Sequence, residues 1–201
     1  GPSFAHEAIA GSPTAVALAG TNLKDAEIIT SLIGTSRFRP YPMDDRIGAE
    51  VGGAAKNVLA IACGIVVGRE MGDNTRAALI TRGLFEMAML GVAKGAKART
   101  FMGLSGLGDL TLTCNGLNSR NMSLGVELGK GNPLADILAN RNSIAEGVET
   151  ARGIVALARK LNVELPIMEG VYRILHLQAD ITQAIDNLLD RPFTPEFKGL
   201  D

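Results

Sequence analysis

Apolar residues recur at helical spacing almost everywhere from Ile47 onward, and this periodicity limits the fold more than any other feature of the chain. Residues three and four positions apart lie on the same face of an α-helix, so each such series predicts one buried helix face. Two of these series are Ala77, Ile80, Leu84, Met87 and Gly91, and Ala151, Ile154, Ala158 and Leu161. We expect about seven helices in residues 46–201, packed as an all-helical domain.

The first 45 residues have a different pattern. Thr14 to Gly20 is a short run of small and β-branched residues, which suits a buried strand. Apolar residues then follow at helical spacing from Leu23 to Ile33, and Gly34 is expected to end that helix. Phe38 to Met43 indicates a second strand, which its two prolines confine to a sheet edge. The predicted fold is mainly α, with a small α/β unit over residues 1–45.

Local signals place several helix ends. Side chains of Ser and Asp accept from the free N–H groups of a first turn, and proline is tolerated there because it has no N–H. We therefore assign N-caps to Asp73 and Ser119, a capping box to Asp180 with Gln183, and first-turn prolines to Pro133 and Pro166.

Charge and composition exclude several classes of protein. Lys and Arg number 20 and Asp and Glu 21, so no basic surplus indicates a nucleic acid or an anionic membrane as partner. The longest apolar run, Val58 to Val67, is too short to span a bilayer and indicates a buried helix. Gly1 to Glu7 has neither the basic nor the apolar region of a signal peptide. We expect no membrane insertion.

Metal-binding and disulfide-forming residues are few. Cys63 and Cys114 lie far apart in apolar stretches, which favours two buried free thiols and a cytoplasmic protein. His6 and His176 are too isolated to complete a metal site with them. We expect no structural metal.

Lys56 is the only charged residue between Gly52 and Ala60, in a helix suited to burial. A lone lysine in such a place commonly extends its ammonium group to solvent from a helix end. The alternative is a partly desolvated ammonium that exchanges protons near neutral pH. For this residue alone both interpretations stay open.

Gly103 to Cys114 is the second unusual segment, because it has three close glycines and Asp109 as its only charge. One interpretation is a tight loop with Asp109 as a turn or cap residue. The other is a backbone that approaches a ligand closely, with Asp109 orienting a cation such as Lys56.

Ser119-Arg120-Asn121 opens a predicted helix after a polar loop. Free N–H groups and the helix dipole favour an anion at such a position, and a guanidinium forms a bidentate fork suited to phosphate. A capped, solvated helix start is the simpler alternative. The combination predicts a small phosphorylated ligand.

Seven motifs occur in the order and approximate spacing found in bacterial-type NAD(P)-dependent glycerol-3-phosphate dehydrogenases, which the chain resembles from Gly1 to about Tyr172. They are GPSFA at 1–5, GGAAKN at 52–57, GDNTRAALITRG at 72–83, GLSGLGDL at 103–110, TC at 113–114, SRN at 119–121 and AEGVETA at 145–151. The resemblance implies an oxidoreductase that interconverts sn-glycerol 3-phosphate and dihydroxyacetone phosphate with NAD or NADP and feeds phospholipid synthesis.

The resemblance also implies roles for individual residues. Lys56 would be the general acid/base, with Asp109 as the acidic residue beside it. Both would also bind substrate, and the matched substrate-binding positions are Gly1, Ser3, Lys56, Asp109, Ser119, Arg120 and Asn121. The matched cofactor-binding positions are Ala5, Arg120, Ile144 and Glu146.

The glycine-rich cradle for a dinucleotide is missing from the sequence, since no G-x-G-x-x-G follows a strand and opens a helix. In the family, GPSFA follows most of the Rossmann domain. Residues 1–45 are therefore expected to be the remnant of that sheet, with the main NAD(P)-binding segment absent and with it the residues that choose between NAD and NADP. We expect the 201-residue chain to be inactive alone. The open edge of the strand Thr14 to Gly20 is expected to favour a homodimer.

Two other functions remain open. A related two-domain dehydrogenase with a catalytic lysine would act on a β-hydroxy acid or ketopantoate. Such substrates are carboxylates, and the phosphate-suited helix start at Ser119 favours glycerol 3-phosphate over them. The non-enzymatic alternative is a helical module that serves only in oligomerisation.

Overall fold

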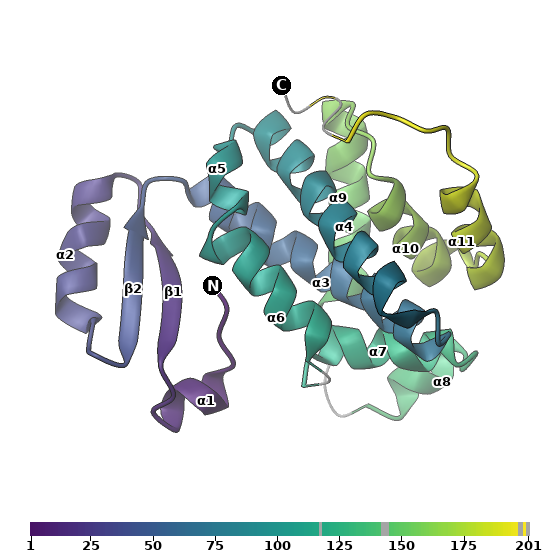
Figure 1. Ribbon diagram of the computed structural model, residues 1–201, viewed down its shortest axis with the longest axis horizontal. Coiled ribbons are helices and arrows are strands. Elements are labelled where there is room, and N and C mark those ends of the chain that lie inside the picture. Colours follow the sequence, from purple (N-terminus) through teal and green to yellow (C-terminus); the bar gives the residue numbers. More distant parts are fainter. Residues whose placement is uncertain (117, 142–144, 197–198, 200–201) are drawn as a thin grey trace.

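The computed structural model describes residues 1–116, 118–141, 145–196 and 199. Figure 1 shows a small α/β unit beside a larger helical body. In the small unit, β1 (Thr14–Ala19) and β2 (Phe38–Met43) pair in parallel, with Thr14 opposite Phe38. The helix α2 (Leu23–Ile33) connects them and packs against the sheet. The predicted strand–helix–strand unit is confirmed, and a short additional helix, α1 (Ala5–Ile9), precedes it.

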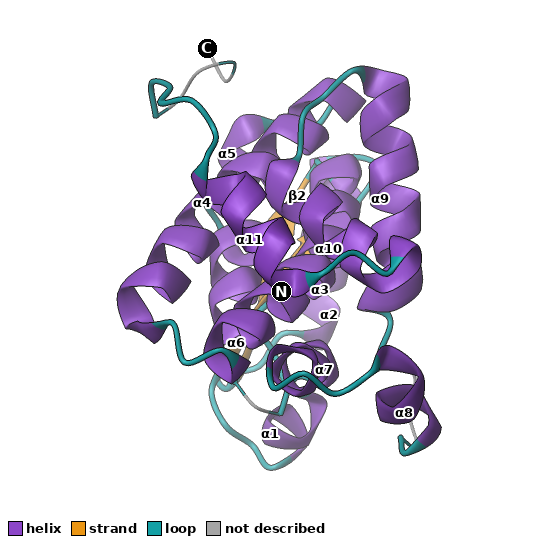
Figure 2. Cartoon of the chain, turned by 90° about the vertical axis from the view of Figure 1, so that its right-hand side faces the viewer, coloured by secondary structure: helices purple, strands orange, loops and turns teal. Residues whose placement is uncertain are grey.

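The helical body is built around α3 (Arg46–Gly68) and α4 (Gly72–Lys94). Its remaining elements are α5 (Ala98–Phe101), a π-helical turn η1 (Leu104–Gly108), α6 (Asp109–Asn115), α7 (Arg120–Gly129), α8 (Leu134–Ala139), α9 (Gly147–Leu161), α10 (Pro166–Leu177) and α11 (Ile181–Leu189). Figure 2 shows helices throughout this body and the two strands behind it. Within the described ranges, the body has nine α-helices where about seven were expected, and α5, with four residues, is too short to show a period.

The centre of the core is α3, which packs against α4, α6, α7 and α9. Its residues from Val58 to Val66 are all buried. The closest contact is with α7: a Cβ at Gly64 would collide with Met122 O, and one at Gly125 would collide with Ile61 O. The two backbones therefore meet through glycines, and any side chain at the crossing would force them apart.

By length and composition the whole of α3 is long and apolar enough to cross a membrane, whereas the run Val58 to Val67, predicted to be a buried helix, is shorter and lies in its core-facing part. The helix extends beyond the run Val58 to Val67 at both ends. Its most apolar window is 67% buried inside the fold, which is typical of the core helix of a globular protein.

Most predicted helix ends agree with the structure. Ser119 caps α7 and Asp180 caps α11, where its Oδ1 accepts from Gln183 N at 2.9 Å. Pro166 is the first residue of α10, whereas Pro133 directly precedes α8. The N-cap assigned to Asp73 was wrong, because α4 begins one residue earlier and the Asp73 carboxylate lies in its first turn.

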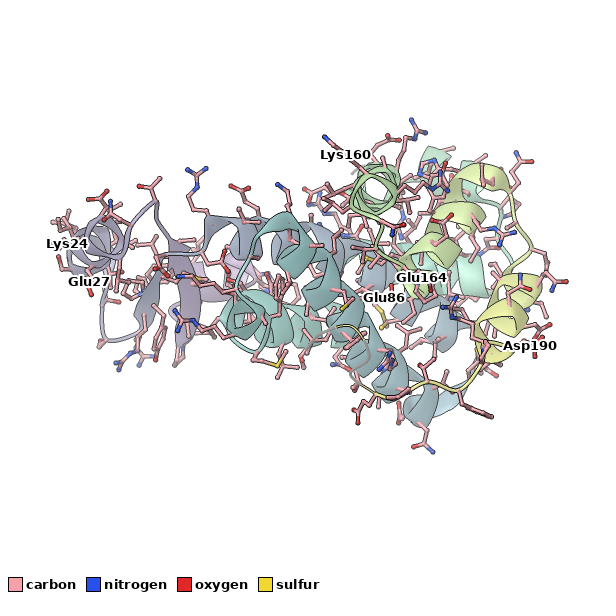
Figure 3. The ribbon with its side chains drawn as sticks, turned by 90° about the horizontal axis from the view of Figure 1, so that it is seen from above. Lys24, Glu27, Glu86, Lys160, Glu164 and Asp190 are labelled. Atoms are coloured by element: carbon pink, nitrogen blue, oxygen red, sulfur yellow. The ribbon has the colours of Figure 1, made fainter. Side chains whose placement is uncertain are left out.

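A buried carboxylate joins α4 to α10. Glu86 accepts from Ile167 N at 2.7 Å and from Met168 N at 3.1 Å, so it satisfies N–H groups at the start of α10. Figure 3 shows Glu86 inside the helical body, while Lys24 and Glu27 lie on α2, in the small α/β unit at the opposite end of the molecule. Burial raises the pKa of Glu86 to about 7, and the two backbone hydrogen bonds only partly oppose this effect.

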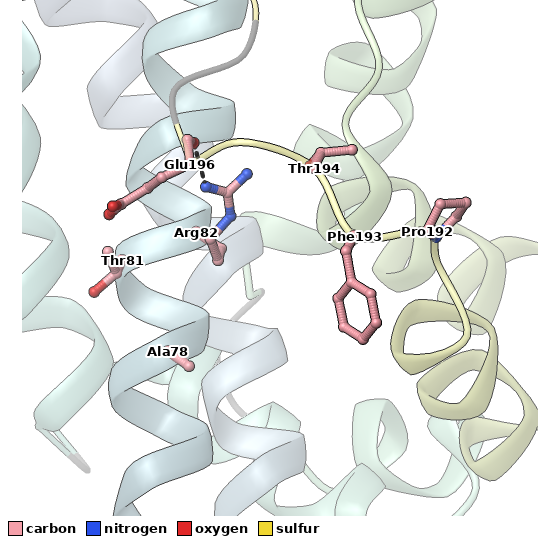
Figure 4. Close-up of a pocket in the computed structure, with 7 residues that line it drawn as sticks. All are labelled: Ala78, Thr81, Arg82, Pro192, Phe193, Thr194 and Glu196. Carbon is pink, nitrogen blue, oxygen red and sulfur yellow. Dashed lines mark hydrogen bonds between the residues drawn. The ribbon is translucent and has the colours of Figure 1, made fainter.

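The segment after α11 crosses α4, where Arg82 Nη1 donates to Glu196 O at 2.7 Å (Figure 4). A pocket of about 510 Å³ lies between this segment and α4, and a larger cavity of about 840 Å³ borders it. Neither cavity is lined by Lys56, Asp109 or Arg120. The candidate site therefore lies elsewhere on the helical body.

Candidate active site

Two glycines bring Asp109 to Lys56. Gly52 lies one helical turn before Lys56 on α3, and a Cβ there would collide with Ser105 O in η1. Gly106 packs in the same way against the backbone of Phe101. Because Asp109 follows η1 directly, this close backbone approach places its side chain against α3.

Lys56 and Asp109 form an ion pair in which Lys56 Nζ donates to Asp109 Oδ2 at 2.7 Å. The Asp109 side chain is 5% exposed and that of Lys56 is 22% exposed. The wide η1 turn fixes the backbone of Asp109, because the Asp109 N–H donates to Leu104 O. The Asp109 carbonyl oxygen in turn accepts from Thr113 Oγ1 at 2.6 Å. Since an ammonium has three protons, Lys56 can donate to Asp109 and still face a ligand.

The start of the chain runs past this ion pair. The Gly1 nitrogen lies 3.5 Å from Asp109 Oδ2, and a Cβ at Gly1 would lie 2.9 Å from Val16 Cα in β1. Ser3 is exposed, with its Oγ 3.5 Å from Gly1 O. The structure thus places Gly1 beside the pair and Ser3 next to Gly1, whereas Ala5 begins α1 and is exposed.

The start of α7 forms a second cluster. Ser119 is buried, and its Oγ accepts from Met122 N at 3.3 Å. Asn121 is also buried, and its Oδ1 accepts from Gly147 N at 2.9 Å. Arg120 is 54% exposed, with its Nη2 3.5 Å from Glu146 Oε1. The predicted residues Ser119, Arg120, Asn121 and Glu146 therefore lie together, while Ile144 falls outside the described residues.

Gly147 connects this cluster to α3. A Cβ at Gly147 would lie 2.8 Å from Asn57 O and 2.7 Å from Asn121 Oδ1, so α9 begins directly against the residue that follows Lys56. Sequence reasoning missed this role, as it missed that of Gly52. The GG doublet before Lys56 was the available signal for Gly52, because glycine inside a helix is unfavourable unless a close contact needs it.

Asp45 caps the N-terminal end of α3, the helix that carries Lys56. Its buried carboxylate accepts from Gly48 N and Lys97 N, each at 2.9 Å, and from Thr100 Oγ1 at 2.6 Å. Burial tends to raise the pKa of Asp45, but the hydrogen bonds from Thr100, Gly48 and Lys97 outweigh it and lower that pKa. The carboxylate therefore stays ionised and holds α3 against α5.

Both cysteines are buried and free. A hydrogen bond with Cys63 and then burial raise the pKa of Cys114 well above its ordinary value. In the part of the chain that the structure describes, no group of three or more His, Cys, Asp or Glu residues is placed to hold a metal ion.

Comparison with known proteins identifies the family of this chain. A family model described as NAD-dependent glycerol-3-phosphate dehydrogenase C-terminus matches residues 45–186, which include Lys56, Asp109 and Ser119 to Asn121. The chain belongs to this family.

Curated members of the glycerol-3-phosphate dehydrogenase family match almost the whole chain. The glycerol-3-phosphate dehydrogenase [NAD(P)+] of Parvibaculum lavamentivorans is 56% identical over 98% of the chain, and that of Rhodospirillum rubrum is 52% identical over 98%. The crystal structure of glycerol-3-phosphate dehydrogenase from Coxiella burnetii is 44% identical over 95% of the chain, with a TM-score of 0.90. The chain spans only 59%, 56% and 59% of these three proteins, respectively.

Proposed function

We propose that this chain is the substrate-binding and catalytic part of an oxidoreductase that interconverts sn-glycerol 3-phosphate and dihydroxyacetone phosphate with NAD or NADP. In the longer protein this reaction would supply glycerol 3-phosphate for phospholipid synthesis. The observation that carries the proposal is the 2.7 Å pair of Lys56 with Asp109, next to a helix start suited to an anion. The names of the relatives at 56% and 52% identity support it.

Lys56 is the proposed general acid/base. In oxidation its amine takes the proton of the C2 hydroxyl, and in reduction its ammonium returns a proton to the ketone oxygen. The nicotinamide, when bound, accepts the hydride from C2 or returns it. Asp109 holds Lys56 Nζ in place and balances its positive charge, because the carboxylate is itself fixed at the end of η1.

The start of α7 is the proposed phosphate site. The backbone N–H groups of Arg120 and Asn121 lie in the first turn, where the helix dipole favours an anion. Asn121 Oδ1 accepts from Gly147 N, which fixes the orientation of the amide. Its NH₂ group can then donate to substrate. The Arg120–Glu146 pair is exposed, and such pairs contribute little, so Arg120 can turn to a phosphate at small cost.

The described residues suit only the part of a dinucleotide site that lies next to the substrate, and not a site for the pyrophosphate. The turn between β1 and α2 follows a strand and opens a helix, but it contains the single glycine Gly20. Asn22 Oδ1 already accepts from Asp25 N there, and the first-turn carboxylate of Asp25 disfavours a phosphate. From this chain we propose that Ala5, Arg120, Ile144 and Glu146 contact NAD(P).

The same proposal covers domain organisation and assembly. Residues 1–45 would belong to the dinucleotide-binding domain and residues 46–201 to the substrate domain, which the start of the family match at residue 45 supports. We also propose a homodimer; among the described residues β1 pairs in a sheet only with β2, while Gly1 lies against Val16 and Ala17 of β1. Two buried free thiols suit a cytoplasmic protein.

Restoring the upstream coding region provides the test. The longer protein is expected to reduce dihydroxyacetone phosphate with NADH or NADPH, whereas the 201-residue chain is expected to show no turnover. Turnover of a β-hydroxy acid or ketopantoate in place of dihydroxyacetone phosphate would contradict the proposal.

Binding to the chain itself separates a substrate site from an oligomerisation module. Glycerol 3-phosphate should shift the amide resonances at the start of α7, and Arg120→Ala should weaken this binding. Arg159→Ala is the matched control, because Arg159 is an exposed arginine near the other end of α9, paired with Glu169. Equal binding by the two variants would argue against a phosphate site at Arg120.

A further inference from the structure

Arg141, which matches none of the family motifs, reaches the start of α7. Its Nη1 donates to Arg120 O at 2.7 Å, and its Nη2 donates to Ser123 Oγ at 2.8 Å. Ser123 Oγ in turn donates to Arg120 O at 3.2 Å. One guanidinium therefore binds two positions of the first turn of α7, in the bidentate geometry that a lysine cannot reproduce.

Two further contacts join the first turn of α7 to the residues at the start of α9. Gly147 N donates to Asn121 Oδ1 at 2.9 Å, and the Glu146 carboxylate lies 3.5 Å from the Arg120 guanidinium. Arg141, Glu146 and Gly147 thus each contact the first turn of α7. Every one of these contacts involves a residue next to, or part of, the proposed phosphate site.

The environment of Arg141 suits a structural hydrogen-bonding role. The residue is half-buried, and burial lowers its pKa while the negative charge of Glu127 partly offsets that effect. An arginine nevertheless remains charged at any physiological pH. Its hydrogen bonds are therefore charge-assisted and partly shielded from water, which makes them stronger than those of an exposed side chain.

We propose that Arg141 is a positioning residue for substrate binding, which holds Arg120 and residues 145–147 in the arrangement that receives the phosphate. This inference rests on the proposed function. Because Arg141 contacts α7 rather than Lys56 or Asp109, its loss should change the affinity for substrate and leave proton transfer at Lys56 intact.

The kinetic test uses the longer protein with the upstream region restored. Arg141→Met should raise KM for dihydroxyacetone phosphate about tenfold, with kcat changed less than about threefold. Arg141→Lys should give an intermediate KM, because a lysine makes a single point contact. Ser123→Ala should raise KM less, and the double variant should be no worse than Arg141→Met alone, since both remove the same contact. Arg159→Met is the control and should leave KM unchanged.

The contact can also be measured without catalysis. In the 201-residue chain, Arg141→Met should shift the amide resonances of Arg120 to Ser123 and of Gly147, and Arg159→Met should not. If those resonances shift but the wild-type longer protein does not use dihydroxyacetone phosphate, the proposed function fails while the contact stands. An unchanged KM in Arg141→Met would overturn the positioning role. A fall in both kcat and thermal stability, with no rise in KM, would overturn it as well.

Discussion

Lys56 Nζ lies 2.7 Å from Asp109 Oδ2, although 53 residues separate them in the chain. The two side chains come from α3 and α6, and the π-helical turn η1 delivers Asp109 to α3. Turns of this kind occur often at functional sites, where they place a side chain that a regular helix would turn away. The pair therefore depends on the close backbone approach of η1 to α3 at Gly52.

Gly52→Ala should separate the catalytic pair. The new methyl would collide with Ser105 O, so η1 must move, and stability should fall by about 1–3 kcal/mol. In the longer protein kcat should fall as well, because Asp109 would no longer hold Lys56 Nζ in place. Gly53→Ala is the matched control on the same helix, because a Cβ there meets no atom within 4 Å. Equal activity and equal urea midpoints for the two variants would argue against this account.

Gly64→Ala should destabilise the crossing of α3 and α7. Its Cβ would collide with Met122 O, and overpacking a contact between two backbones costs about 1–3 kcal/mol or more. Gly153→Ala on α9 is the control, since its Cβ meets open space and the change should stabilise by up to about 1 kcal/mol. Urea unfolding of the 201-residue chain measures both; a Gly64→Ala midpoint at or above wild type would contradict the packing described.

Glu86 should make stability depend on pH. Burial raises its folded-state pKa from 4.5 to about 7, so the folded protein holds this proton more tightly than the unfolded chain does. Its contribution is fully present below about pH 4.5 and is lost as pH rises through about 7, by roughly 3 kcal/mol at most. Glu86→Gln should remove about 2 kcal/mol of the change in unfolding free energy between pH 5 and pH 7.

The control for Glu86 is Glu50→Gln, whose side chain is 63% exposed in a pair with Arg46. This variant should keep the wild-type pH dependence. If Glu86→Gln and Glu50→Gln give the same slope of unfolding free energy against pH, the titration is wrongly assigned.

Much of the fold followed from sequence because its signals are local. The strands Thr14–Ala19 and Phe38–Met43 and the helix Leu23–Ile33 agree with the predicted ranges, since small residues, prolines and apolar spacing act within a few positions. The short helix α5 and the π-helical turn η1 were missed, because each is too short to show an apolar period.

The proposed site divides in the same way. Lys56 and Asp109 stand out as single charges in apolar segments, and Ser119 to Asn121 as a capped helix start, but this local context left simpler alternatives open, and the family resemblance implied their roles. Arg141 gave no such signal, because arginines are common on helical surfaces and its partners lie 18 and 21 residues away. Contacts between distant segments have no sequence pattern of their own, and only the structure shows them.

The most direct test of the central claim is the turnover of dihydroxyacetone phosphate by Lys56→Ala in the longer protein, beside Lys130→Ala, which changes an exposed lysine paired with Glu127. Removing a general acid/base should lower kcat by about 10²- to 10⁴-fold, and a small primary amine added to the assay should restore part of it. Lys130→Ala should be as active as wild type. A kcat for Lys56→Ala within about tenfold of wild type, with no response to added amine, would contradict the assignment of Lys56 as the proton donor and acceptor.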